Sequence, residues 1–124
     1  MITTIATVAA GLLGAALIWL GTNAFIAPRA AAAFGIPAPV DHPDFLRWMQ
    51  PKGVREIVPG IFIFVAMVTA SPAVLGWYLL TFALIPAGDA AIVLRSGGPK
   101  HVAYGVHAAT AAVMLAVGLV LLLA

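Results

Sequence analysis

Four long apolar runs dominate this sequence, and they restrict the folds that it can adopt. They cover about residues 2–26, 53–70, 73–94 and 102–124. An α-helix needs roughly 20 residues, at about 1.5 Å per residue, to cross a hydrocarbon core about 30 Å thick, and each run is close to that length. A membrane span without helices would require a closed barrel, and alternating strands are not visible in the sequence. We therefore predict an all-α fold, an integral membrane four-helix bundle, with residues 1–124 as a single transmembrane domain.

The composition excludes several classes of protein. Hydrophobic residues make up 64% of the chain and charged residues only 8%, whereas soluble domains have roughly 45–50% and 25%. So few charges cannot cover a water-soluble globule, which excludes a soluble enzyme, a nucleic-acid-binding domain and a disordered tail. We expect the lipid bilayer as a partner and no nucleic acid. Because the chain has no cysteine, it has no disulfides, thiolate chemistry or Cys-ligated metals.

The distribution of basic residues predicts the orientation of the chain. Signal peptides begin with positive charge, and residues 1–20 carry no charge, so the first run is expected to be a retained span. An even number of spans places both termini on one side of the membrane and the two longer connections on the other. All six basic residues lie at that second side: Arg29, Arg47, Lys52, Arg55, Arg95 and Lys100. The positive-inside rule then predicts a multi-pass protein of the plasma (inner) membrane with both termini outside.

The connection between the first two runs contains its own structural signals. Pro28 is expected to end or kink the first helix, and Pro43 to begin a new helix through Trp48. Tryptophan beside Arg47 and Lys52 is typical of a segment in the headgroup layer. We therefore predict a short interfacial helix in the cytoplasmic loop between spans one and two.

Each predicted span carries polar side chains near its cytoplasmic end. They are Asn23 in the first span, Arg55 and Glu56 in the second, Asp89 in the third and His107 in the fourth. Charges within a span are costly, so they tend to face the bundle interior and to pair with one another. We therefore predict a polar pocket at one depth near the cytoplasmic face.

The helical period suggests how these side chains are arranged. Arg55 and Glu56 are adjacent and diverge by about 100°, so one is expected to meet Asp89 and the other His107. Tyr104 precedes His107 by three residues and is expected to share its face, with Tyr104 and Asn23 contacting substrate. Close helix approach is expected at several glycines: Gly11, Gly14, Gly60, Gly76 and Gly105.

The polar cluster favours an enzyme that acts on a lipophilic small molecule entering from the bilayer. Carboxylates beside an imidazole have the mixed protonation tendencies that general acid–base catalysis needs. In this hypothesis Asp89 and His107 exchange a proton, and Glu56 is the second acid or base. Arg55 stabilises a developing negative charge or orients a carboxylate. Isomerisation, cyclisation or epoxide opening would suit the cluster, and no cofactor is expected.

Other interpretations stay open. A buried salt-bridge network of Arg55, Glu56, Asp89 and His107 would only fix helix register. In a small proton-coupled transporter of lipophilic substrates, Glu56 or Asp89 would carry the proton, although the small multidrug-resistance exporters resemble this chain in length alone. An incidental metal site could use Glu56, Asp89 and His107, but we expect no metal because no helix has a Glu-x-x-His pair. A homo-oligomer also stays open.

Several segments together resemble a known family. They are residues 52–60 (KGVREIVPG), 85–89 (IPAGD), 93–98 (VLRSGG) and 103–108 (AYGVHA). The chain resembles, over essentially its whole length, an uncharacterised family of short four-span membrane proteins that neighbours the DoxX-like group. The resemblance implies a four-helix bundle with Arg55, Glu56, Asp89 and His107 as characteristic polar positions. It implies no activity.

Overall fold

The fold is known from a computed structural model, which describes the backbone of residues 1–124 and every side chain except those of Ala31 and Ala32. The elements are α1 (Ile2–Ile26), a 3-10 helix η1 (Pro28–Phe34), α2 (Pro43–Thr69), α3 (Pro72–Phe82), α4 (Leu84–Arg95), α5 (Lys100–Val102), a π-helix η2 (Ala103–Ala108) and α6 (Ala109–Leu123). All regular elements of this described backbone are helical, so the prediction of an all-α fold is confirmed.

Three helical stretches are long and apolar enough to cross a membrane. They are Ile2–Ile26, Pro72–Arg95, in which α3 and α4 run on from each other, and Lys100–Leu123. α2 has 27 residues, but Lys52, Arg55 and Glu56 interrupt its apolar part. The apolar stretch that follows Glu56 covers only about 20 Å of helix. Three stretches of this kind indicate a membrane protein.

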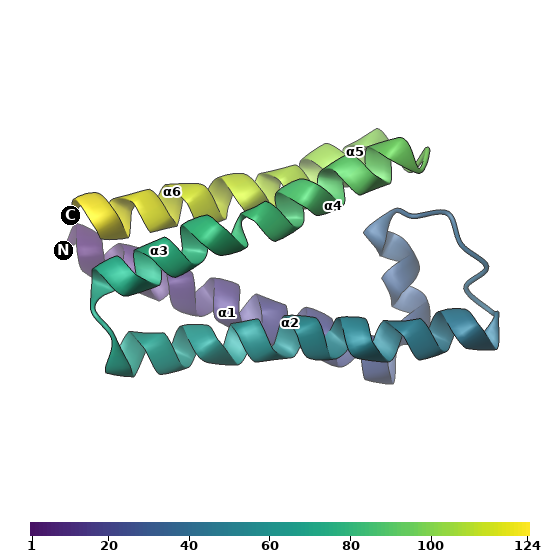
Figure 1. The fold of residues 1–124 in the computed structure, drawn as a ribbon, viewed down its shortest axis with the longest axis horizontal. Helices are drawn as coiled ribbons and strands as arrows, with labels where there is room; N and C mark the ends of the chain where they lie inside the picture. Colours follow the sequence, from purple (N-terminus) through teal and green to yellow (C-terminus); the bar gives the residue numbers. More distant parts are fainter.

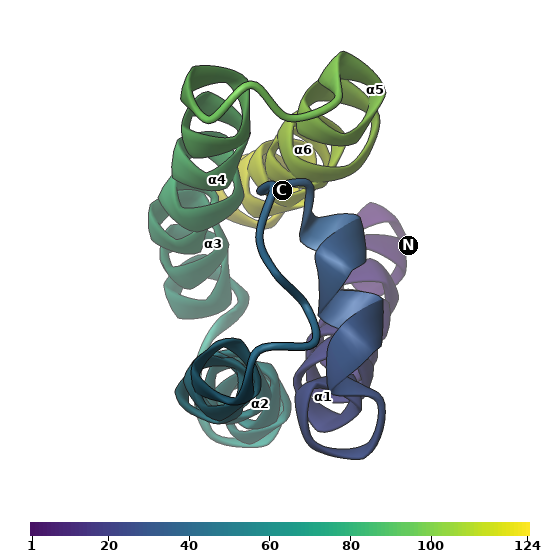
Figure 2. The same cartoon turned by 90° about the vertical axis from the view of Figure 1, so that its right-hand side faces the viewer.

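The helices form two layers that meet at one end and separate at the other. α1 packs mainly against α2, and α3 packs mainly against α6, while α4 packs against η2, α5 and α6. Both termini lie at the end where the layers converge, and η1 lies between the layers at the opposite end (Figure 1). The view from that end shows η1 beside α1, with α4 and α2 well apart (Figure 2). The two helical layers are therefore close together at one end of the molecule and apart at the other.

Glycines allow α1 and α2 to approach closely. A Cβ atom at Gly60 would lie 2.7 Å from the carbonyl oxygen of Gly14, and one at Gly21 would lie 2.5 Å from the carbonyl oxygen of Gly53. Such distances are shorter than real contacts, so a side chain at either position would force the backbones apart. The expectation for Gly105 is wrong, because no atom from another described part of the chain would lie within 4 Å of a Cβ there.

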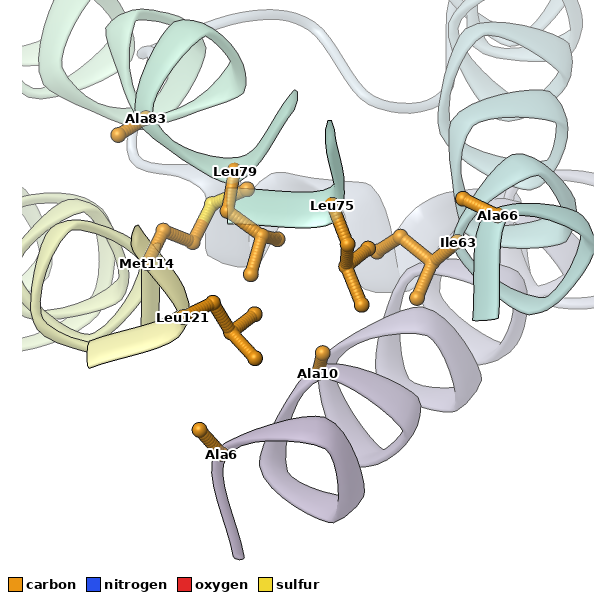
Figure 3. Close-up of a cluster of buried hydrophobic side chains, with 9 residues drawn as sticks. All are labelled: Ala6, Ala10, Ile63, Ala66, Leu75, Leu79, Ala83, Met114 and Leu121. Carbon is orange, nitrogen blue, oxygen red and sulfur yellow. The ribbon is translucent and has the colours of Figure 1, made fainter. Parts of the chain in front are cut away.

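The apolar core lies at the end with the termini. Small residues of α1, together with Ile63 and Ala66 of α2, face the larger side chains of α3 and α6 (Figure 3). Ile63 and Leu79 have no solvent-exposed surface. The cluster consists of Ala6, Ala10, Ile63, Ala66, Leu75, Leu79, Ala83, Met114 and Leu121. Its closely packed side chains join the two layers.

The segment after the first helix differs from the sequence prediction. A helix begins at Pro43 as predicted, and the His42 side chain caps it by accepting a hydrogen bond from the Asp44 N–H. However, this helix continues through Pro51 and Pro59 to Thr69 instead of ending as a short separate element. Each proline removes one backbone donor, and the helix tolerates both losses. The short helix in the connection is instead η1.

Candidate functional site

A cavity of about 400 Å³ lies where the two layers separate. Its polar lining comes from Asn23, Lys52, Arg55, Glu56, Asp89, His107 and Thr110. Its apolar lining includes Leu17, Leu20, Phe82, Ile85, Val106 and Met114. η1 adds Ala30, Ala33 and Phe34. The volume falls within the roughly 300–1,000 Å³ typical of small-molecule sites.

The cavity is polar at one end and apolar at the other. The charged residues come from the helix segments nearest to η1, whereas Leu17 and Phe82 come from segments nearer to the core. Met114 belongs both to the cavity lining and to the apolar core, so it lies at the boundary between the two regions. This polarity matches a molecule that has a polar head and an apolar body.

His107 is held in a defined orientation. Among the described side chains, it is the one polar or ionisable group that is buried, with 7% of its surface exposed. Its Nε2 atom lies 2.7 Å from the carbonyl oxygen of Phe34, and its ring packs against the Phe34 ring with centroids 4.4 Å apart. A carbonyl oxygen can only accept a hydrogen bond, so Nε2 carries the proton. In the neutral imidazole, Nδ1 is therefore left with its lone pair free.

The free nitrogen of His107 faces a carboxyl group. Nδ1 lies 4.0 Å from Oδ2 of Asp89, which is partly buried on α4. This separation is longer than a hydrogen bond. One water molecule or one polar substrate atom could contact both groups at once. The two side chains therefore form an acid–base pair with room for a reacting atom.

A second pair lies on α2, where the ammonium group of Lys52 contacts the carboxylate of Glu56 one helical turn away. Lys52 also lies over the Phe34 ring, with its Nζ atom 4.9 Å from the ring centroid. Lys52 and Phe34 were not among the site residues predicted from the sequence. The four-residue spacing of Lys52 and Glu56 could have indicated their pairing, but Phe34 lies in a connection and had no comparable signal.

Arg55 is placed differently from the prediction. It lines the cavity and is exposed, and it makes no ion pair with any side chain that the structure describes. Glu56 contacts Lys52, and Asp89 faces His107. Neither Arg55 nor Glu56 therefore forms the predicted contact with Asp89 or His107. That expectation is wrong. Glu56 instead pairs with Lys52 one turn earlier on the same helix, as their four-residue spacing allows.

Of the two residues predicted to bind substrate, Asn23 lines the cavity and Tyr104 does not. Asn23 lines the cavity, and its side-chain N–H donates to the carbonyl oxygen of Trp19 at 3.1 Å. Tyr104 is 59% exposed and is not part of the cavity lining. The π-helix η2 has a wider turn than an α-helix, so a three-residue spacing no longer keeps Tyr104 on the face of His107. The expected wall formed by Tyr104 and His107 is therefore absent from this cavity.

The structure also shows how the residues of the metal alternative are placed relative to one another. No group of three His, Asp or Glu side chains there is close enough to hold a metal ion. Glu56 contacts Lys52 on its own helix, whereas Asp89 faces His107.

Comparison with known proteins identifies the family. A family model described as a domain of unknown function (DUF4267) matches residues 14–121, so the chain belongs to this family. The resemblance noted in the sequence to a family of unknown function is thereby confirmed. The match includes all the cavity residues discussed above. No curated protein and no solved structure matches the chain.

Proposed function

We propose that this chain is a four-span membrane protein that binds a lipophilic small molecule and performs acid–base chemistry on it. The observation that carries the proposal is the His107–Asp89 pair, which lies in an amphipathic cavity with 4.0 Å between the facing atoms. Acid–base groups with space for a reacting atom are suited to moving a proton. The apolar lining suits a substrate that arrives from the bilayer.

The orientation of His107 suggests the role of each group. The Phe34 carbonyl holds the Nε2–H, so Nδ1 acts as the general base and takes a proton from the substrate. Asp89, in its protonated form, returns a proton to another substrate atom. An isomerisation or cyclisation then ends with no net proton change in the substrate. In an epoxide opening, His107 takes a proton from a water molecule whose oxygen bonds to one epoxide carbon, and Asp89 protonates the oxygen that leaves that carbon. In each case a proton passes from His107 back to Asp89 to complete the cycle. At the polar end of the cavity, Glu56 serves as a second acid or base. Arg55 stabilises negative charge on the substrate.

The pattern of charge pairing supports a site over a purely structural network. A network that fixes register must connect different helices, but the close ion pair between Lys52 and Glu56 lies within α2. The His107–Asp89 contact does join two helices, but it is too long for a direct hydrogen bond. The polar groups therefore line a shared cavity and form few direct contacts between helices.

Substitution separates these interpretations. We expect Asp89→Asn and His107→Ala each to give protein that elutes as a folded species in detergent. Mass spectrometry of lipid extracts from membranes that contain the wild-type chain should reveal a product that both variants fail to make. Unfolding of both variants would instead favour the structural network.

Transport is the second candidate function because carboxylates lie within the helices. Proteoliposomes would distinguish it from catalysis. A pH gradient would drive uptake of a lipophilic cation by a transporter, and Glu56→Gln would abolish this uptake. Such a result would support transport instead of catalysis. We expect no such uptake.

The four-span topology is part of the proposal and rests on the outer surface of α2. Val58, Phe62, Val65 and Val68 are exposed apolar residues that recur at helical spacing. They form a stripe that is suited to contact with lipid, while the charged residues stay on the first half of the helix. Together with the basic residues at one side, this surface favours a spanning α2 and the arrangement with both termini outside.

Single-cysteine variants test this topology because the natural chain has no cysteine. A membrane-impermeant maleimide is applied to intact cells that express Ala38→Cys, Ser71→Cys or Ser96→Cys. We expect Ser71→Cys to be labelled directly, and the other two variants only after permeabilisation. Labelling of Ala38→Cys and Ser71→Cys from the same side would show that α2 does not span.

A further inference from the structure

The cavity is lined by two cations and two carboxylates, but these four groups are not arranged as two ion pairs. Lys52 has Glu56 as its partner, and Asp89 faces His107. Arg55 is the cavity-lining cation that makes no ion pair with a described side chain. A guanidinium group that lines a cavity and has no ion pair there can bind an anion through its N–H donors. The polar end therefore has an unused binding capacity for negative charge.

The chemistry of Arg55 narrows the class of anion. A guanidinium group presents a planar fork of N–H donors that matches two oxygen atoms of a carboxylate or phosphate group. The Lys52 ammonium group lies one turn away along the chain and lines the same cavity. The polar end also carries two carboxylates, but Glu56 is paired with Lys52 and Asp89 faces His107. Arg55 is thus left to bind an anion, which favours an oxyanion over a neutral alcohol or an amine.

The opposite end of the cavity is apolar and indicates the kind of body that the oxyanion carries. Leu17, Phe82 and Met114 line this end, and the packed core begins at Met114. A volume of about 400 Å³ is at the small end of the range for small-molecule sites and suits one short chain rather than the two acyl chains of a phospholipid. The occupant is thus expected to be linear or compact, with a single apolar body.

We infer that the cavity binds a single-chain amphiphile with an oxyanion headgroup, either a carboxylate or a phosphate monoester. The headgroup contacts Arg55 and Lys52, and the apolar body extends toward Met114. This inference rests on the proposed function and names the substrate class for the same site. It also places the atoms near the headgroup closest to His107 and Asp89, which line the same polar end.

Photolabelling tests the inference directly. The purified full chain is placed in nanodiscs of phosphatidylcholine and irradiated with decanoic acid that carries a diazirine in its chain, or with the methyl ester of the same probe. Peptide mapping then identifies the labelled residues. We expect the acid to label α1, α3 and α6 around Leu17, Phe82 and Met114, and the ester to label them at least about tenfold less, as expected for the loss of one charge-assisted hydrogen-bonded contact.

Matched variants assign the effect to Arg55. Arg55→Gln should reduce labelling by the acid at least about tenfold, and Arg55→Lys should retain part of it because the charge is kept but the fork is lost. Arg95→Gln is the control, because Arg95 is an exposed cation on α4 that does not line the cavity. It should label like the wild type. Equal labelling of Arg55→Gln and the wild type by the acid would overturn the inference.

The remaining outcomes separate this inference from the proposed function. Competition by unlabelled decanoate or by decyl phosphate shows which of the two oxyanions the site prefers, and competition by either supports the inference. If acid and ester label the cavity equally, the oxyanion class is wrong while binding of a lipophilic molecule stands. If neither probe labels the cavity, both proposals are contradicted.

Discussion

The two ends of the helix bundle are built from the same helices but have opposite properties. At the end with the termini, nine buried apolar residues join the two layers. At the other end, the layers separate around a cavity of about 400 Å³ that is lined by charged residues. The number and length of the helices therefore do not determine whether the interior is packed or hollow. Side-chain size and charge along each helix decide where the layers can close.

Irregular helix geometry is concentrated at the cavity end. Pro86 cannot donate to the carbonyl of Phe82, and the helix is interrupted there, between α3 and α4. The π-helix η2 carries His107 into the same region, and Pro59 of α2 lines the cavity as well. Non-regular backbone within a membrane is tolerated where it lines a cavity or is covered by protein. These features thus help to keep the layers apart.

The largest expected effect contrasts a leucine of the core with a leucine of the cavity. Leu79→Ala should lower the free energy of unfolding by about 2–5 kcal/mol, because Leu79 is fully buried and its removal leaves a void. Leu20→Ala should cost less than about 1 kcal/mol, because Leu20 is 56% exposed and borders existing space. Reversible unfolding in mixed micelles measures both values. Equal costs would mean that the two ends are packed alike.

An intermediate effect is expected where η1 meets the cavity end. Gly35 has a φ of 103°, and a Cβ atom there would lie 2.9 Å from Cγ1 of Val102. Gly35→Ala should therefore strain this segment by about 1–3 kcal/mol and loosen the contact between Phe34 and His107. The rate of His107 modification by diethylpyrocarbonate should rise severalfold, with exposed His42 and His101 as internal references.

Gly97→Ala is the matched control for this prediction. Gly97 also has a positive φ, of 71°, but a Cβ atom there would meet no other described part of the chain within 4 Å. The control should share the backbone strain without exposing His107. If both variants, or neither, change the reactivity of His107, then η1 does not hold the imidazole in place.

The smallest expected effect is on stability at the acid–base pair. Asp89→Asn should change the free energy of unfolding by less than about 1 kcal/mol, because Asp89 has no close ion pair to lose. Removing one member of a tight buried pair would cost about 3–5 kcal/mol. Thermal unfolding in the same micelles distinguishes the two values. A loss of the larger size would show that the cavity end is held together by its charges, as the core end is by its apolar contacts.

The sequence predicted the coarse features because they depend on local patterns. Runs of apolar residues long enough to span a bilayer indicated the helices, and the depth of polar residues within those runs indicated their common location. Five of the six predicted site residues line the cavity: Asn23, Arg55, Glu56, Asp89 and His107. These features required only the helical rise and the positions of the residues along each helix.

Contacts between different elements of the site depend on information that the helical period does not contain. The pairing of Glu56 with Lys52 is different, because both lie on α2 and their four-residue spacing could have indicated it. The path of the connection brings the Phe34 carbonyl to His107, although the two residues are 73 positions apart. The prediction for Tyr104 assumed regular α-helical spacing, whereas a π-helix widens the turn around it. Pairing between different elements therefore required the three-dimensional structure.

The central claim is that the cavity end holds a lipophilic molecule in contact with His107. An experimental structure of the full chain in native lipid tests it most directly. We expect elongated density that extends from Arg55 and His107 to Met114, with His107 still donating to the Phe34 carbonyl. A closed interior with no cavity, in which Arg55 forms an ion pair with Asp89, would contradict it.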